Sequence, residues 1–146
     1  MFIMIYLTRK EHFNAAHKLY NPLWSKEKNY QVYGDCSNEN WHGHNYELLV
    51  TIKGSINDDD GMVINLKLLS KIINDEIISK VDHKNLNIDV PFLKNKITST
   101  ENVVVEFWNI LEKKISSLKN YKCFLHCVKL YETPKNSVEY YGPEGK

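Results

Sequence analysis

An alternating run of residues, 45–53, constrains the fold of this chain more than any other feature. One parity of the run holds Tyr46, Leu48, Val50 and Ile52, and the other holds Glu47, Leu49, Thr51 and Lys53. A period of two predicts a strand with one buried face. Extended backward, the same strand carries His42 and His44 on one face, about 6.5–7 Å apart along the strand.

These two imidazoles predict a metal site. Zinc binds neutral imidazole nitrogens, and catalytic zinc sites use three protein ligands and keep a fourth position open. A first strand-like segment, 2–14, is followed by His17. If it pairs antiparallel with the second strand, the end of one lies beside the start of the other, and His17 meets His42 and His44. The alternative is that these histidines are unrelated polar residues at strand ends.

The rest of the chain predicts two helices and two more strands. Apolar residues three and four apart predict a helix over 66–81, with Asn65 as its N-cap. The residues 98–101, Thr-Ser-Thr-Glu, have the form of a capping box that opens a second helix. Two last strands are predicted at 123–132 and 137–141.

This order, ββααββ, predicts an α+β fold with a four-stranded antiparallel sheet and two helices on one face. The segment 20–35 has no period and predicts a long loop leading to Cys36. Two helices cover only one face of such a sheet, and the strands are rich in Leu and Val. We therefore expect self-association to cover the other face.

The bulk properties predict one domain over residues 1–146. The net charge is +1, which argues against a broad nucleic-acid-binding surface. No apolar run approaches the roughly 20 residues of a membrane span, and no secretion signal is evident, so we expect a cytoplasmic protein without a membrane partner. Three cysteines are too few for a disulfide framework, and Cys123 and Cys127 are expected to be small buried hydrophobes.

Seven short motifs, in this order and spacing, resemble the 6-pyruvoyl-tetrahydropterin synthase family of the tunnelling-fold (T-fold) superfamily. The resemblance covers nearly the whole chain. It is carried by Phe13-Asn-Ala-Ala-His17, Tyr33-Gly-Asp-Cys36, His42-Gly-His-Asn-Tyr46, Gly61-Met-Val63, Val81-Asp-His-Lys-Asn-Leu86, Ser99-Thr-Glu-Asn-Val103 and Tyr131-Glu-Thr133.

The resemblance implies a role for each of nine residues. The zinc ligands of the family fall on His17, His42 and His44, and its catalytic cysteine falls on Cys36. The Asp-His pair that partners this cysteine falls on Asp82 and His83. The glutamate that anchors the pterin ring falls on Glu132, and a threonine-glutamate pair that opens the second helix falls on Thr100 and Glu101.

The implied reaction converts 7,8-dihydroneopterin triphosphate to 6-pyruvoyl-tetrahydropterin with loss of triphosphate, in tetrahydrobiopterin biosynthesis. Such a zinc-dependent carbon–oxygen lyase needs no external redox cofactor, because proton shifts reduce the ring while they oxidise the side chain. Cys36 would act as the base in its thiolate form, and His83 would relay the proton. The family also implies a homohexamer of two stacked trimers whose sheets join into a barrel, with sites between subunits.

Three positions depart from the family pattern. Trp41 replaces the usual glycine before His42, Asn14 replaces a serine, and Ser37 replaces an asparagine. Trp41 could narrow the pocket and change the fit of the substrate. None of the three removes a metal ligand or an expected catalytic group.

Other functions remain open on the sequence alone. The related 6-carboxy-tetrahydropterin synthases, which make a queuosine precursor, usually have a shorter spacer before the first histidine; here five residues, Ser37 to Trp41, follow Cys36. A non-catalytic zinc or pterin binder is a second alternative, although it would need no base. Without the resemblance, Asp82-His83 is equally a helix-end pair, Glu132 a solvated strand end and Cys36 a free loop thiol.

Overall fold

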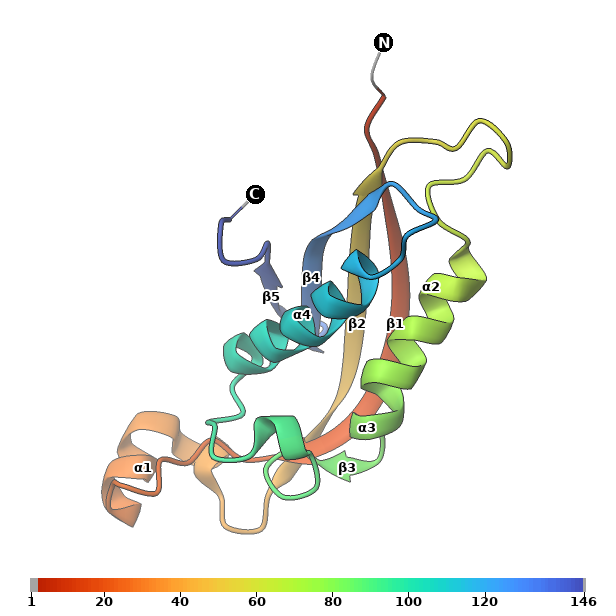
Figure 1. Ribbon diagram of the computed structural model, residues 1–146. Helices are drawn as coiled ribbons and strands as arrows, with labels where there is room; N and C mark the ends of the chain where they lie inside the picture. Colours follow the sequence, from red (N-terminus) through yellow and green to blue (C-terminus); the bar gives the residue numbers. More distant parts are fainter. Residues whose placement is uncertain (1–2, 146) are drawn as a thin grey trace.

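The computed structural model describes residues 3–145 of the chain. In this range the strands form a single sheet, against which the helices pack (Figure 1). Its strand order is β3-β1-β2-β4-β5, and β3 alone runs parallel to its neighbour β1. The strands are β1 (Ile5–His17), β2 (His42–Gly54), β3 (Lys84–Asn85), β4 (Cys123–Thr133) and β5 (Asn136–Tyr140). The helices are α1 (Lys26–Tyr33), α2 (Leu66–Ile73), α3 (Ser79–Val81) and α4 (Thr100–Ser116).

The α+β class is therefore correct, but the expected four-stranded antiparallel sheet is wrong in strand count and order. After α3 the chain returns along the edge of β1, where His83 donates its backbone N–H to the Asn14 carbonyl at 2.7 Å. The adjoining strand β3 pairs only with Ala15 and Ala16. A two-residue strand is too short to show a period, so no pattern in the sequence could reveal it.

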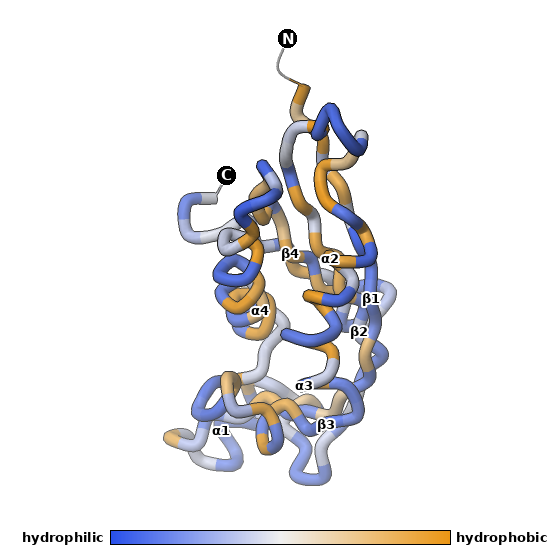
Figure 2. Tube along the Cα trace, turned by 45° about the vertical axis from the view of Figure 1, so that its right-hand side comes forward, coloured by the Kyte–Doolittle hydropathy of each residue, from blue (hydrophilic) through white to orange (hydrophobic). Residues whose placement is uncertain are grey.

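Helices α2 and α4 cover one face of the sheet, and the hydrophobic core lies between these helices and the sheet (Figure 1). The inward residues of β1 and β2 include Phe13, Tyr46 and Leu48, each at most 1% exposed. Along α4, hydrophobic and hydrophilic residues follow one another in short stretches, as in a helix with one buried side (Figure 2). Cys123 and Cys127 are buried as expected, and burial raises the pKa of both thiols.

The opposite face of the sheet is mostly polar, so the expectation of an apolar face was wrong. The strand residues Leu48, Val50 and Leu130 all point toward the helices and are fully buried. On the other face the Thr8 and Thr51 hydroxyls lie 2.8 Å apart, and Lys10 pairs with Glu47 at 3.0 Å. Burial of apolar surface on this face therefore gives no argument for self-association.

Two helix predictions need correction. The segment 20–35 contains α1, which the sequence hid because α1 carries no apolar stripe and only Asn29 of its residues is buried. The helix over 66–81 is α2, a π-helical turn (Asn74–Ile78) and α3 in succession. Asn65 is the N-cap of α2, as predicted.

The cap of α4 lies one residue later than predicted. Ser99, and not Thr98, accepts a hydrogen bond from the Asn102 N–H and caps the helix. Thr98 is fully buried and turns its hydroxyl toward Asn87. This shift frees Thr98 for a role beside the histidine cluster.

Candidate functional site

Three histidines meet where β1 ends and β2 begins, at the end of the molecule near α1 (Figure 1). In the antiparallel ladder His17 lies directly opposite His42, and Ala15 lies opposite His44. One possible ligand atom from each ring lies within 4.8 Å of the other two. The alternation of β2 places His42 and His44 on the helix-covered face with His17, as the sequence predicted.

The protonation of His17 suits a metal ligand. The ring is 1% exposed, and burial lowers its pKa to about 4, so the imidazole is neutral at pH 7. Its Nδ1–H donates to the Thr98 carbonyl at 2.8 Å, which leaves Nε2 with a free lone pair. Burial likewise lowers the pKa of His42.

Unpartnered nitrogens give a second sign that this cluster holds a ligand. His17 Nε2, His42 Nδ1 and His44 Nε2 are buried and accept or donate no well-aligned hydrogen bond among residues 3–145, although the Glu132 carboxylate approaches His44 Nε2 to 3.3 Å. Buried polar atoms are rarely left unpaired, because each costs desolvation energy. Three converging imidazoles are a donor set that zinc accepts, and they leave room for a fourth ligand. The residues present therefore fit a metal ion.

Glu132, at the end of β4, lies beside this cluster. Its Oε1 is 3.3 Å from His44 Nε2, and its Oε2 accepts a hydrogen bond from the Thr100 hydroxyl. A hollow of about 510 Å³ is lined by Glu132, Thr100, Glu101, Ser99 and Leu19. The structure thus places Glu132 next to His44, and Thr100 and Glu101 line the same hollow as Glu132.

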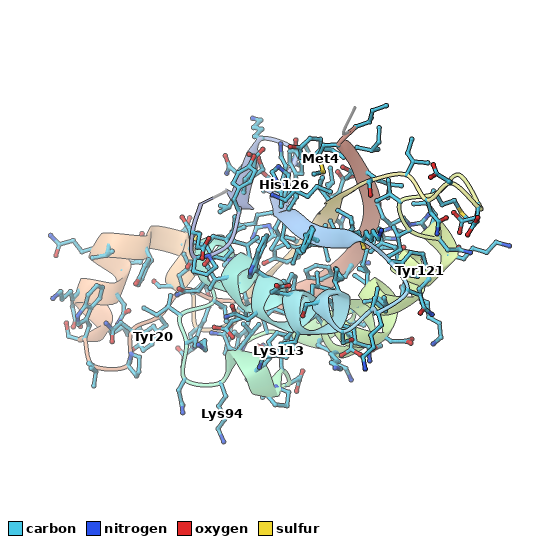
Figure 3. All side chains as sticks on the ribbon, turned by 45° about the horizontal axis from the view of Figure 1, so that its top comes forward. Met4, Tyr20, Lys94, Lys113, Tyr121 and His126 are labelled. Carbon is cyan, nitrogen blue, oxygen red and sulfur yellow. The ribbon has the colours of Figure 1, made fainter. Side chains whose placement is uncertain are left out.

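Cys36 lies in a 3-10 turn (Gly34–Ser37) that follows α1. Its carbonyl accepts from the Leu19 N–H at 2.8 Å, so the turn is tied to the segment just after His17. The thiol is exposed, and within the described range it makes no hydrogen bond. Tyr20 follows the Leu19 that this turn contacts, and it lies far from Met4 and His126, so the Cys36 turn belongs to the α1 end of the molecule (Figure 3).

Asp82 and His83 form a dyad on the edge of the sheet. His83 Nδ1 lies 3.0 Å from Asp82 Oδ2, and the Asn14 N–H donates to Asp82 Oδ1 at 2.9 Å. The Asn14 N–H is the main reason that the pKa of Asp82 lies below its usual value. His83 is 77% exposed and adopts a φ of 57°, a left-handed conformation that is strained for histidine.

One chain does not join this dyad to Cys36. His83 lines an open hollow of about 560 Å³ together with residues that include Asn14, Gly43, His44 and Asn45. Asn14, Gly43 and Asn45 belong to the strand parity that faces away from the helices. No hydrogen bond or ion pair joins Cys36 to either member of the dyad within residues 3–145.

Two residues beside the cluster were missed from the sequence. Tyr46 is the next inward residue after His44; its ring centroid lies 5.5 Å from that of His44, and its buried hydroxyl has no partner in the described part of the chain. Burial strongly raises the pKa of this phenol. Tyr46 has the same parity as His42 and His44 in the alternating run, so the sequence did contain a signal that it lies beside the cluster. Thr98 was interpreted only as a cap, and nothing in its sequence context indicated its contact with His17.

Comparisons with known proteins agree with these features. A family model described as 6-pyruvoyl tetrahydropterin synthase matches residues 6–143. A 6-pyruvoyl tetrahydrobiopterin synthase of Dictyostelium discoideum is 44% identical over 138 residues, which cover 94% of this chain and 96% of that protein. The structure of Caenorhabditis elegans 6-pyruvoyl tetrahydropterin synthase is similar with a TM-score of 0.87 and 35% identity, and the match covers 97% of each chain.

The carboxy-type relatives are more distant. A 6-carboxy-5,6,7,8-tetrahydropterin synthase of Bacillus subtilis is 27% identical over 144 residues, which cover 95% of this chain and 86% of that protein. The preference for the pyruvoyl type, drawn from the five-residue spacer after Cys36, is therefore confirmed. Among the described residues no helix has the length and apolar character needed to cross a membrane.

Proposed function

This chain belongs to the 6-pyruvoyl tetrahydropterin synthase family, and we propose that it converts 7,8-dihydroneopterin triphosphate to 6-pyruvoyl-tetrahydropterin with elimination of triphosphate. The observation that carries the proposal is that the histidine cluster, a candidate metal site, lies beside a carboxylate that could bind a pterin ring. Three converging imidazoles lie directly beside Glu132, whose Oε1 is 3.3 Å from His44 Nε2. A metal site and a carboxylate anchor are both needed for a pterin whose side chain reacts.

We propose that the metal is zinc, held by His17, His42 and His44. When bound, zinc would supply Lewis-acid stabilisation of the negative charge that develops on the substrate side chain. The Thr98 carbonyl fixes the tautomer of His17, and burial keeps this ring neutral at pH 7. The protein therefore presents its ligands without having to remove a proton from His17.

Glu132 binds the pterin ring in this proposal. A carboxylate accepts two parallel hydrogen bonds from the amino group and the adjacent ring N–H, so it fixes both the position and the orientation of the ring. The Thr100 hydroxyl holds one carboxylate oxygen in place. Glu101 lines the same hollow at the first turn of α4, and we assign it a supporting role in substrate binding.

Proton transfer falls to Cys36, His83 and Asp82. Cys36 would abstract a carbon-bound proton as thiolate, and His83, oriented by Asp82 at 3.0 Å, would relay it. Because no hydrogen bond or ion pair links Cys36 to His83 within residues 3–145, and Cys36 does not line the hollow that holds His83, we propose that the complete site combines residues of two copies. This fits a homohexamer built as two stacked trimers.

The sheet has edges through which copies can join. Within residues 3–145, β3 pairs with only two residues of β1, so most of the outer edge of β1 has no partner, and β5 ends the sheet on the other side. Open edges invite pairing with another chain, and repeated pairing closes sheets into a barrel. A monomer in sedimentation at micromolar concentration would contradict the hexamer.

A non-catalytic zinc and pterin binder is the second candidate, because one chain keeps Cys36 and His83 apart. One assay decides among the candidates: the purified, zinc-loaded protein is incubated with 7,8-dihydroneopterin triphosphate, and the products are separated by mass. We expect the pyruvoyl product and triphosphate. A 6-carboxy product would identify the queuosine-type activity, and binding without turnover would identify a binder. A cytoplasmic location and the absence of a nucleic-acid partner stay predictions.

A further inference from the structure

A buried hydrogen-bond chain lies behind His17. The His17 Nδ1–H donates to the Thr98 carbonyl, and both residues are at most 1% exposed. A backbone carbonyl can direct an imidazole only if its own peptide is held in place. The Thr98 hydroxyl does this by donating to Asn87 Oδ1 at 2.9 Å.

Asn87 clamps the residue that follows His17. Its Oδ1 accepts from the Lys18 N–H at 3.1 Å, and its Nδ2 donates to the Lys18 carbonyl at 3.0 Å. One amide side chain therefore binds both main-chain groups of Lys18 and the hydroxyl of Thr98. It joins the end of β1, the turn after β3 and the residue before the cap of α4.

We infer that Asn87 and Thr98 are positioning residues of the metal site: they fix the direction in which His17 presents Nε2 and so raise its affinity for zinc. The inference rests on the metal site of the proposed function. Partners of metal-binding histidines fix the ring and its tautomer, and losing them typically weakens metal binding by about 10–100-fold. Within residues 3–145 neither side chain hydrogen-bonds to His42 or His44, so the expected effect passes through His17.

The test uses the full-length protein freed of metal. Zinc affinity is measured by competition with a chromophoric chelator, and the geometry of the ligands is followed by the visible absorption of bound Co²⁺. Unfolding in urea reports the stability of each metal-free variant. The variants are Thr98→Val, which removes the hydroxyl at constant shape, Thr98→Ser, which keeps it, Asn87→Ala and Asn87→Asp.

Thr98→Val and Asn87→Ala should bind zinc about 10–100-fold more weakly and change the Co²⁺ spectrum, whereas Thr98→Ser should retain both properties. The control is Ser70→Ala, which removes a part-buried hydrogen bond to Glu11 far from the cluster. It should lower stability without moving zinc affinity or the spectrum. A merely structural role predicts that all destabilised variants behave like this control.

Unchanged zinc affinity in Thr98→Val and Asn87→Ala overturns the inference. If either does not fold, Asn87→Asp decides, because it keeps the acceptor for Thr98 but replaces the donor toward the Lys18 carbonyl with a second acceptor. Wild-type affinity in that variant also overturns the inference. If the unaltered protein binds no zinc, the proposed metal is wrong and the positioning role falls with it.

Discussion

Glu132 Oε1 lies 3.3 Å from His44 Nε2, although the two residues belong to different strands. The last ladder pair between these strands is Glu47 with Tyr131, so Tyr46 and Glu132 are the next neighbours in the row. The proposed metal ligand and the proposed ring-binding carboxylate therefore share one end of the sheet. If both proposed roles hold, this contact sets the distance between the pterin ring and the reacting side chain of the substrate.

Replacing Glu132 should separate ring binding from metal binding. Glu132→Ala removes the charged acceptor, a contact worth about 1.5–3 kcal/mol, so the affinity for a pterin without phosphates should fall about 10–100-fold. Zinc content should persist, since the three histidines remain. Pterin fluorescence and bound metal are measured together. Glu47→Ala, which removes a carboxylate from the opposite face, should change neither; equal losses in both variants would rule out the anchor.

Acid should destabilise the metal-free protein through His17. Its pKa is about 4 in the folded chain and about 6.5 when unfolded, so the unfolded state binds more protons between these values. The free energy of unfolding should therefore rise with pH from 4 to 6.5 and level off above, by about 3 kcal/mol from this group.

His17→Gln supplies the control for that titration, because glutamine carries no titrating proton. Urea unfolding of both proteins across the same pH range isolates the contribution of His17. The free energy of unfolding of His17→Gln should vary less with pH than that of the unaltered protein. Parallel curves would show that burial of His17 does not govern the acid sensitivity.

Cys36→Ala should abolish turnover and leave binding intact. A positioned acid–base group contributes roughly 10²–10⁴-fold to a rate, and the exposed thiol has no place in the histidine cluster. Turnover, zinc content and pterin affinity are compared with those of Cys127→Ala, in which a buried strand cysteine is lost. That variant should lose stability and keep turnover. Near-normal rates in Cys36→Ala would make His83 the next candidate for the base.

The strand that carries His42 and His44 could be predicted because its pattern is local. Alternation of apolar residues from Tyr46 onward fixes the parity of His42 and His44, and a one-residue slip would bury Lys53. Pairing with β1 then brings in His17 by simple antiparallel geometry. Both the centre of the sheet and the histidine cluster follow from these local rules.

The predictions that failed concern elements whose formation depends on specific side-chain and main-chain partners. Helix α1 is held by Asn29, which bonds to Asn21, Trp24 and Ser25 instead of presenting an apolar stripe. Strand β3 exists because His83 and Leu86 bond to β1 backbone atoms. Ser99 caps α4 in place of Thr98, and the Thr98 carbonyl accepts the hydrogen bond of His17. None of these partners can be identified from the spacing of residues in the sequence.

Trp41 gives a prediction about strain. Its φ is 69°, and its ring centroid lies 4.3 Å from the Lys18 ammonium. Trp41→Ala loses this contact and keeps the left-handed strain, whereas Trp41→Gly loses the contact and relieves the strain. Urea unfolding should therefore show Trp41→Gly to be about 1 kcal/mol more stable than Trp41→Ala. Lys18→Met, which removes only the charge, measures the contact by itself; if the alanine variant is the more stable, the strain argument fails.

Mixing two inactive variants tests whether a site spans two copies. Cys36→Ala lacks the proposed base, and His83→Ala lacks the proposed relay. If each site takes Cys36 from one copy and His83 from another, subunit exchange between the variants creates some sites with both groups. We expect the mixture, incubated until subunits exchange, to recover part of the turnover that neither variant has alone. The control mixes Cys36→Ala with a double variant carrying both substitutions, which cannot rebuild a site. No recovery despite exchange confirmed by mass spectrometry would place the complete site within one chain.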